Sequence, residues 1–428
     1  MSQLLTSKFV AKSLAATVSV LMLSSVANAA TAEQKQIQEL RKEVETLKTL
    51  IQQQQQVQLQ QASQIEEVKT APKAQSGLAG FKSKTGADVN LYGFVRGDAA
   101  YQIEGGSAMF NRINDVQLDG STGKKSTEDR FDTAVSTTRI GLDFKAPVQG
   151  ADVGGKIEVD FRGSNESVRI RHAYLTYNNW LVGQTTSSFL SGETTPEMLD
   201  FGSPLGIGTE RTPMVRYSDK INANTQYLVG LEKGHSDNRL PVATAKVAHK
   251  FAEGKGTVTG RALLQEVRAR TTDNVTENSP AFDDTAFGWG LAAGLNYKAT
   301  EALTLNADYS HVKGDDKFIL YTNKNPRYTV DADNDLELNE FNAFTLGATY
   351  KFNPKLRSTL GYGAIFFDVN NKNSNSENDN LQQGWLNVMY NPVKPITFGA
   401  EYVYGEREVA NGAKGKDNRI GVMAKYDF

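Results

Sequence analysis

The fold is decided by a stretch that reads VRIRHAYLTY over residues 168–177 and continues through a tight turn into a loop over residues 188–210. Side chains alternate between the two faces of a strand, so Arg169 and Arg171 share one face. The chain turns at Asn178 and Asn179, returns as a short strand over 180–187, and then enters the loop, which is rich in Gly, Pro, Ser and acidic residues. We expect the arginines to face a water-filled lumen and the loop to fold in and narrow it.

The first 29 residues have the pattern of a secretory signal peptide. Lys8 and Lys12 form a basic region, an apolar run follows over 14–23, and Ala27-Asn28-Ala29 is a cleavage site of the A-x-A type. The alternative is an N-terminal membrane anchor. The short apolar run and the charged, Gln-rich sequence that follows it favour the signal peptide.

Charge and composition exclude several classes of protein. Removal of residues 1–29 takes away two lysines and no acid, so the formal charge changes from −2 to −4, which argues against a nucleic-acid partner. The chain has no Cys, which excludes disulfides and thiolate metal sites. Its four histidines have no metal-ligand spacing, and we expect neither a metal site nor a cofactor.

Residues 30–70 are predicted to form an α-helical coiled coil. Seven apolar residues fit one heptad frame: Ile37, Leu40, Val44, Leu47, Ile51, Ile65 and Val68. A lone helix would leave this stripe in water, so the pattern predicts self-association. The alternative is a disordered Gln-rich spacer, since Gln occupies the middle layers. Ala71-Pro72 ends the helix, and residues 71–86 are a predicted linker.

From residue 87 onward the hydrophobic period changes to two, which predicts an all-β transmembrane barrel of sixteen antiparallel strands over 87–428. No apolar run is long enough for a spanning helix, so a closed barrel is the remaining way to cross a membrane. The predicted strands are 88–101, 131–146, 151–162, 168–178, 180–187, 212–218, 223–232, 240–251, 256–268, 284–298, 302–313, 340–352, 355–367, 382–390, 396–405 and 418–428.

The connections and the last strand support the barrel against a soluble sandwich. Long and short connections alternate, as in outer-membrane barrels with long external loops and tight periplasmic turns. The chain ends on Tyr426 and Phe428, a pattern similar to the signal that the outer-membrane barrel assembly machinery reads.

Arginines on the strands are the candidate pore residues. An Arg that faces lipid at mid-membrane costs roughly 2–4 kcal/mol, so strand arginines are expected to point inward. The candidates are Arg96, Arg139, Arg169, Arg171, Arg216, Arg261, Arg357 and Arg419, with Arg162 also expected in the lumen. By the same alternation His172 is expected to pack outward. The alternative role for these arginines is to pair with lumen acids and with Glu193, Glu197 and Asp200 of the loop, which would hold the loop without selecting a solute.

Three segments resemble the DcaP-like porins of Gram-negative bacteria: 91–96, 169–177 and 196–202. The resemblance extends over the whole chain. It implies a homotrimer of sixteen-stranded barrels in the outer membrane, a periplasmic coiled coil that holds the trimer, and uptake of small anions such as dicarboxylic acids. It suggests no cofactor.

The expected function is therefore passive diffusion of small hydrophilic, preferably anionic solutes through an arginine-lined constriction. A second hypothesis is a structural coiled-coil tether between outer membrane and periplasm with an incidental or plugged pore. An enzyme is the hypothesis that the sequence supports least, because no catalytic motif is present and no catalytic residue is assigned.

Overall fold

A closed antiparallel barrel of sixteen strands forms in the computed structural model, which describes residues 81–83, 86–110, 113–148, 150–202, 204–271, 282–320, 325–331, 333, 335–369, 374 and 376–428. The predicted signal peptide, the predicted coiled coil and most of the predicted linker lie outside the described residues. Within the linker, β1 (Phe81–Lys82) pairs with the start of the first barrel strand.

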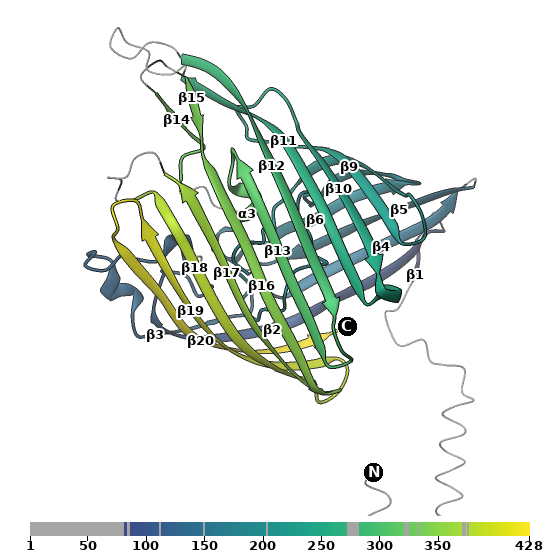
Figure 1. The fold of residues 1–428 in the computed structure, drawn as a ribbon. Helices are drawn as coiled ribbons and strands as arrows, with labels where there is room; N and C mark the ends of the chain where they lie inside the picture. The colour runs from purple at the N-terminus through teal and green to yellow at the C-terminus, as the bar shows by residue number, and fades with distance from the viewer. Residues whose placement is uncertain are drawn as a thin grey trace, which may run out of the picture. The chain divides into compact units, whose positions relative to one another are not determined.

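The sixteen predicted strands are confirmed, each overlapping one strand of the barrel (Figure 1). In chain order they are β2 (Asp88–Glu104), β3 (Arg130–Ala134) with β4 (Arg139–Val148), β5 (Ala151–Asp160), β6 (Arg169–Tyr177), β7 (Trp180–Thr186), β8 (Arg211–Lys220), β9 (Thr225–Glu232), β10 (Val242–Phe251), β11 (Gly256–Thr271), β12 (Phe282–Lys298), β13 (Leu303–Lys313), β16 (Glu340–Asn353), β17 (Leu356–Asp368), β18 (Asn378–Tyr390), β19 (Ile396–Val409) and β20 (Lys414–Asp427).

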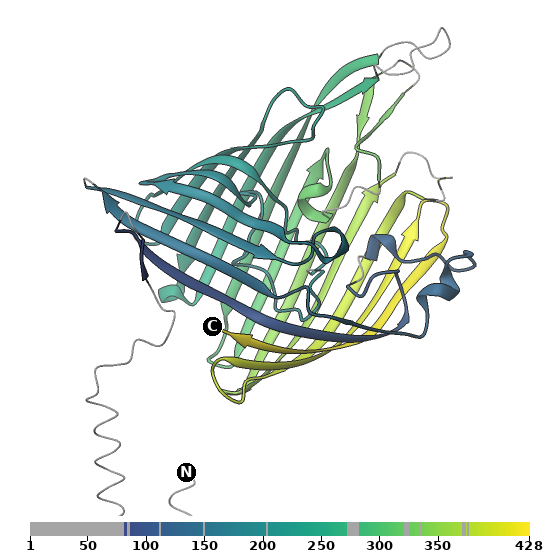
Figure 2. The same ribbon diagram turned by 180° about the vertical axis from the view of Figure 1, so that it is seen from behind.

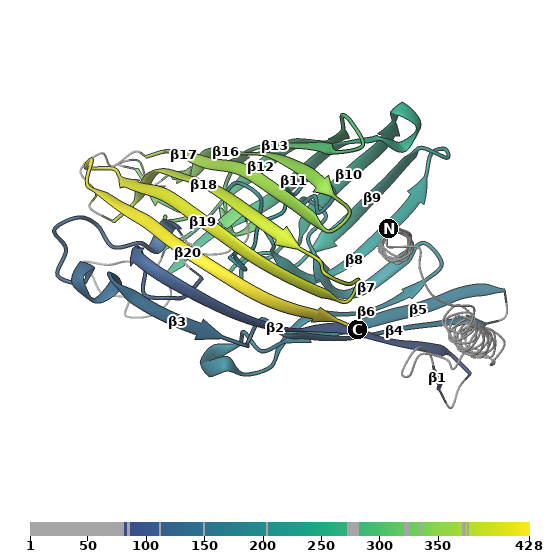
Figure 3. The ribbon, with the colours of Figure 1, turned by 90° about the horizontal axis from the view of Figure 1, so that it is seen from below.

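The barrel closes where β20 pairs with β2, so that the last strand lies beside the first (Figure 3). The ladder runs from Phe94 opposite Asp427 to Glu104 opposite Asn418. The last residue takes part as well, because Phe428 and Gly93 exchange two backbone hydrogen bonds of 3.0 and 3.1 Å. Closure satisfies the backbone groups that an edge strand would leave exposed.

The second barrel strand differs from its prediction as one unbroken segment over 131–146. β3 and β4 both pair with β2, but residues 135–138 leave the ladder between them. Two threonines satisfy β2 at the gap: Thr137 Oγ1 donates to Asp98 (2.7 Å), and Thr138 Oγ1 accepts from the backbone N–H of Arg96 (3.1 Å). At Arg96 a side-chain hydrogen bond thus replaces a backbone one, which periodicity alone does not reveal.

The barrel exposes its apolar side chains on the outer wall. Along β12, Phe287, Trp289, Leu291 and Leu295 are exposed, whereas the alternating residues Gly288, Gly290, Ala292 and Gly294 are buried. An apolar outer wall around a filled interior is the arrangement of a barrel that sits in lipid. None of the helices in the described part of the chain is long and apolar enough to cross a membrane.

Connecting segments fill part of the interior, seen from two sides in Figures 1 and 2. Phe189, Leu190 and Leu205 of the predicted inward loop join Ile113 and Val116 of the 105–129 connection in one buried apolar cluster. The helix α3 (Lys317–Leu320) adds Phe318 and Ile319 to it. The other described elements are a hairpin of β14 (Tyr328–Val330) and β15 (Leu336–Leu338) and short 3-10 helices at 113–115, 124–127, 164–166 and 252–254.

Candidate functional site in the barrel lumen

The loop over 188–210 lies inside the barrel against one wall. Its first part is anchored to β9, β10 and β13. The backbone N–H of Ser188 donates to Glu232 (2.7 Å), Lys246 Nζ pairs with Glu193 (2.6 Å), and Thr194 Oγ1 donates to Asp308 (2.7 Å). The three partners lie 44, 53 and 114 residues further along the chain than the loop residues they bind, so the loop crosses the lumen rather than extending away from the barrel.

The middle of the loop is held by the later strands. Arg357 of β17 pairs with Glu197, and Trp385 Nε1 of β18 donates to the carbonyl of Glu197 (3.0 Å). Glu401 of β19 accepts from the backbone N–H groups of Leu199 (2.7 Å) and Asp200 (2.8 Å). Arg419 of β20 forms an ion pair with Asp200, and Arg96 of β2 donates to the carbonyl of Leu199 (2.6 Å).

Glycines on the inner wall make room for this loop. A Cβ at Gly347 would collide with the ring of Pro196, and a Cβ at Gly363 would collide with the carbonyl of Leu205. Both glycines face inward on strands that the loop crosses, β16 and β17. The wall is therefore shaped to accept the loop at close range.

The opposite wall and the loop enclose a cavity of about 650 Å³. Six arginines line it: Arg96, Arg139, Arg162, Arg169, Arg171 and Arg211. The carboxylates among its lining residues are Glu197, Asp200 and Glu210, all from the loop. Burial raises the pKa of the Glu210 carboxyl, against the opposing effect of Lys317 and Arg211, and favours its neutral form. Among the residues that line the cavity, arginines therefore outnumber carboxylates by six to three.

Carboxylates of β5 hold the central arginines in place. Arg169 makes two hydrogen bonds to Asp160, of 2.9 and 2.6 Å. Arg171 bridges Glu158 (2.8 Å) and Asp160 (3.0 Å), and Arg139 lies 3.3 Å from Glu158. Pairing of this kind reduces the net charge but fixes the direction of each guanidinium.

Seven of the eight predicted pore arginines fall into two groups, and Arg216 belongs to neither. Arg96, Arg139, Arg169 and Arg171 line the cavity. Arg261, Arg357 and Arg419 pair instead with Asp308, Glu197 and Asp200, and Arg261 also donates to the carbonyl of Phe189 (3.2 Å). Arg216 points inward on β8 but is not among the residues that line the cavity. Some of these arginines therefore line the cavity, and others hold the loop or pair with acids of the wall.

Of the three acids singled out in the loop, Glu197 pairs with Arg357 and Asp200 pairs with Arg419. Glu193 pairs with Lys246, which the sequence did not single out. Sequence reasoning also missed Arg211, Phe110 and Phe201, which all line the cavity. Arg211 is the first residue after the loop, and this position next to the loop could have marked it in the sequence as a residue that lines the cavity.

The expectation that His172 packs outward is wrong. Along the β5–β6 ladder Glu158 pairs with His172 and Val159 pairs with Ile170, so Arg171 is an extra, bulged residue. His172 therefore faces the lumen, with Nδ1 at 2.9 Å from Thr185 Oγ1 and Nε2 at 3.7 Å from Glu158. A bulge shifts the alternation by one residue, which a parity argument does not anticipate.

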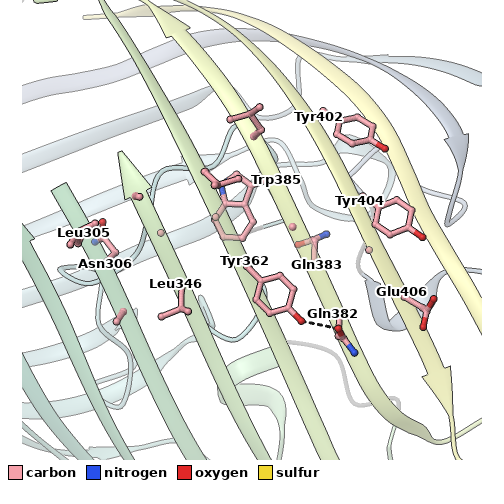
Figure 4. Close-up of a pocket in the computed structure, with 18 of the residues that line it drawn as sticks. Leu305, Asn306, Leu346, Tyr362, Gln382, Gln383, Trp385, Tyr402, Tyr404 and Glu406 are labelled. Carbon is pink, nitrogen blue, oxygen red and sulfur yellow. Dashed lines mark hydrogen bonds between the residues drawn. The ribbon is translucent and has the colours of Figure 1, made fainter. Parts of the chain in front are cut away.

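A separate hollow of about 920 Å³ lies over β13 and β16 to β19 (Figure 4). The exposed side chains of Leu346, Tyr362, Tyr402 and Tyr404 border it, and Tyr362 Oη donates to Gln382 (2.8 Å). These side chains are on the outer wall, so this hollow is not a candidate site for a solute inside the barrel. Within the described residues no group of three or more His, Asp or Glu is placed to hold a metal ion.

Nearly the whole chain matches one known protein family. The model of the DcaP outer membrane protein family matches residues 17–428. The chain belongs to the DcaP family. It is similar to the outer membrane channel DcaP of Acinetobacter baumannii, with 46% sequence identity over 82% of this chain and 100% of that chain and a TM-score of 0.72. No curated protein sequence matches the chain.

More distant porins share the fold of this DcaP-family channel. The anion-selective porin from Comamonas acidovorans is 14% identical, with a TM-score of 0.56 over 80% of this chain and 100% of that chain. The outer-membrane expressed OmpT of Vibrio cholerae is 15% identical, with a TM-score of 0.52 over 81% of this chain and 99% of that chain. The protein is an outer-membrane porin.

Proposed function

We propose that this porin allows passive diffusion of small hydrophilic anions, dicarboxylates in particular, through the arginine-lined cavity. The observation that carries the proposal is the set of six arginines on the wall that faces the inward loop. A ring of basic side chains at the narrow part of a pore lowers the barrier for anions and raises it for cations. The guanidinium fork also matches the geometry of a carboxylate.

Arg211 and Arg216 give a matched pair for testing charge selectivity. Arg211 lines the cavity, and among the described residues its side chain makes no hydrogen bond or ion pair, so R211A leaves no carboxylate without its partner. Arg216 lies on the same strand but away from the cavity. Reversal potentials in a salt gradient across a planar bilayer should show anion preference, reduced in R211A and unchanged in R216A. Cation preference in the natural protein would overturn the proposal.

Dicarboxylate preference has a separate test. Added diacids should block single-channel current at lower concentration than monoacids of similar size, because two carboxylates can engage two guanidinium groups at once. R171A should weaken the block by diacids more than the block by monoacids. Equal block by diacids and monoacids would contradict the dicarboxylate preference but would leave the anion preference standing.

We also propose that residues 1–29 are removed on export and that residues 30–70 form a periplasmic coiled coil that holds a homotrimer. The heptad spacing of seven apolar residues, which a single helix cannot bury, supports self-association, and the resemblance to DcaP-like porins implies that the number of subunits is three. Replacement of Val44 and Ile51 by Asp should convert the oligomer to monomers in mild detergent without loss of the folded barrel. An unchanged oligomer mass would show that the barrel wall alone holds the subunits together.

A further inference from the structure

The loop places one aromatic ring among the arginines of the cavity. The guanidinium carbons of Arg96, Arg139, Arg162 and Arg171 lie 5.5, 5.8, 5.5 and 5.9 Å from the centroid of the Phe201 ring. Each distance is within the range of a cation–π contact. These arginines come from β2, β4, the residues after β5, and β6, so one loop residue contacts four of the six arginines that line the cavity.

Two further phenylalanines extend the cluster. The guanidinium of Arg162 lies 4.6 Å from the ring centroid of Phe110, and that of Arg139 lies 5.1 Å from that of Phe94. Phe110 belongs to the 105–129 connection, and its ring lies 6.1 Å from that of Phe201. Arg139 and Arg162 therefore each contact two aromatic rings.

The position of Phe201 is set by its neighbours in the loop. Asp200 pairs with Arg419, and its carboxylate also accepts from the backbone N–H of Gly202. Glu401 binds the backbone N–H of Asp200 (2.8 Å). The backbone on both sides of Phe201 is thus fixed by hydrogen bonds, and the ring contacts the arginines of the cavity.

We infer that Phe201 is a specificity-determining positioning residue that orders the arginine wall for anion recognition. Guanidinium groups this close together repel one another, and the negative face of an aromatic ring offsets part of that repulsion. A contact with the ring uses no N–H group, so those N–H groups that Asp98, Glu158 and Asp160 do not bind stay available to a ligand carboxylate. The inference rests on the proposed anion selectivity and deepens it.

The competing explanation is that Phe201 only narrows the pore by its bulk. F201L separates the two, because Leu keeps an apolar side chain but has no π face. We expect F201L to weaken diacid block roughly five- to tenfold, the factor that corresponds to loss of cation–π contacts, and to lower anion over cation permeability. Conductance in F201L should stay close to that of the natural channel, whereas F201A should raise it.

F287L is the matched control, because it makes the same change at a ring that is exposed on the outer wall of β12 and does not line the cavity. Heat-modifiable migration on gels checks that each variant barrel is folded. Unchanged block and permeability ratio in F201L, with higher conductance in F201A, would overturn the inference and leave a steric role. Lack of anion preference in the natural channel would instead overturn the proposed function, so the two failures are distinguishable.

Discussion

Arg357 on β17 holds Glu197 at the middle of the inward loop by two parallel hydrogen bonds. Nε donates to Oε2 at 2.7 Å and Nη2 donates to Oε1 at 2.6 Å. Nη1 of the same arginine donates to Asn391 at 2.5 Å, which fixes the guanidinium in its plane. The inward loop is therefore bound to the barrel wall at its midpoint as well as in its first part.

Breaking this pair should loosen the loop without unfolding the barrel. Both side chains are partly exposed, so the coupling is expected to be about 0.5–1 kcal/mol. R357Q should raise amide hydrogen exchange over residues 195–198 by up to about fivefold and increase open-channel current noise. R216Q serves as the control. Equal exchange in R357Q and the natural protein would assign the anchoring to Glu401 instead.

The ion pair between Arg261 and Asp308 should matter far more for stability. Both side chains are only 1% exposed, and Nη2 lies 2.6 Å from Oδ1. D308N leaves a buried guanidinium without its counter-charge, which costs about 3–5 kcal/mol, whereas the double variant R261M/D308L should be milder. Urea unfolding in lipid vesicles measures the difference. A double variant as unstable as D308N would contradict this reasoning.

Two glycines provide a matched test of the close fit between loop and wall. A Cβ at Gly363 would collide with Leu205, whereas a Cβ at Gly260 on β11 meets nothing within 4 Å. G363A should cost about 1–3 kcal/mol and change conductance by shifting the loop. G260A, the same chemical change, should do neither. If G363A had the same conductance as the natural channel, the loop would be able to move away from the added Cβ without changing the pore.

Acid should release the first anchor of the loop. Burial acts to raise the pKa of the Glu193 carboxyl, but the charge of Lys246 and its hydrogen bonds outweigh burial, and the pKa is lowered. A lowered pKa means that this contribution is fully present above the ordinary value of 4.5 and is lost as the pH falls through the lower value in the folded protein. Current noise should therefore rise below about pH 4.5. E193Q should show raised noise already at pH 7 and a smaller change with acid.

The last residue should be needed for assembly. Phe428 exchanges two backbone hydrogen bonds with Gly93 at the seam of the barrel. Deletion of Phe428 removes these bonds and the aromatic end that we propose the assembly machinery reads, so outer-membrane levels should fall severalfold. F428Y should be close to natural levels, since it keeps an aromatic ring and the backbone bonds. Normal levels after the deletion would contradict both parts of this argument.

The sequence alone was sufficient for the barrel. Alternation of apolar and polar residues is a local property, and lipid on one side of a strand enforces it at every position, so sixteen strands can be counted without any knowledge of pairing. The cost of an arginine in lipid was the reason to expect strand arginines inside the barrel, and Arg96, Arg139 and Arg171 are among the residues that line the cavity. The argument failed at His172, because the bulge at Arg171 depends on how β6 pairs with β5.

Only the tertiary structure decided which arginines line the cavity and which hold the loop. Arg357 and Arg171 have the same chemistry and the same inward orientation, but one meets Glu197 of the loop and the other meets Glu158 and Asp160 of the wall. These partners lie 160, 13 and 11 residues away along the chain, and no local pattern specifies the longer contact. The placement of Phe201 among four arginines is of the same kind. A strand pattern determines which side of the wall a side chain occupies, but the path of a loop across the lumen depends on contacts with many strands at once.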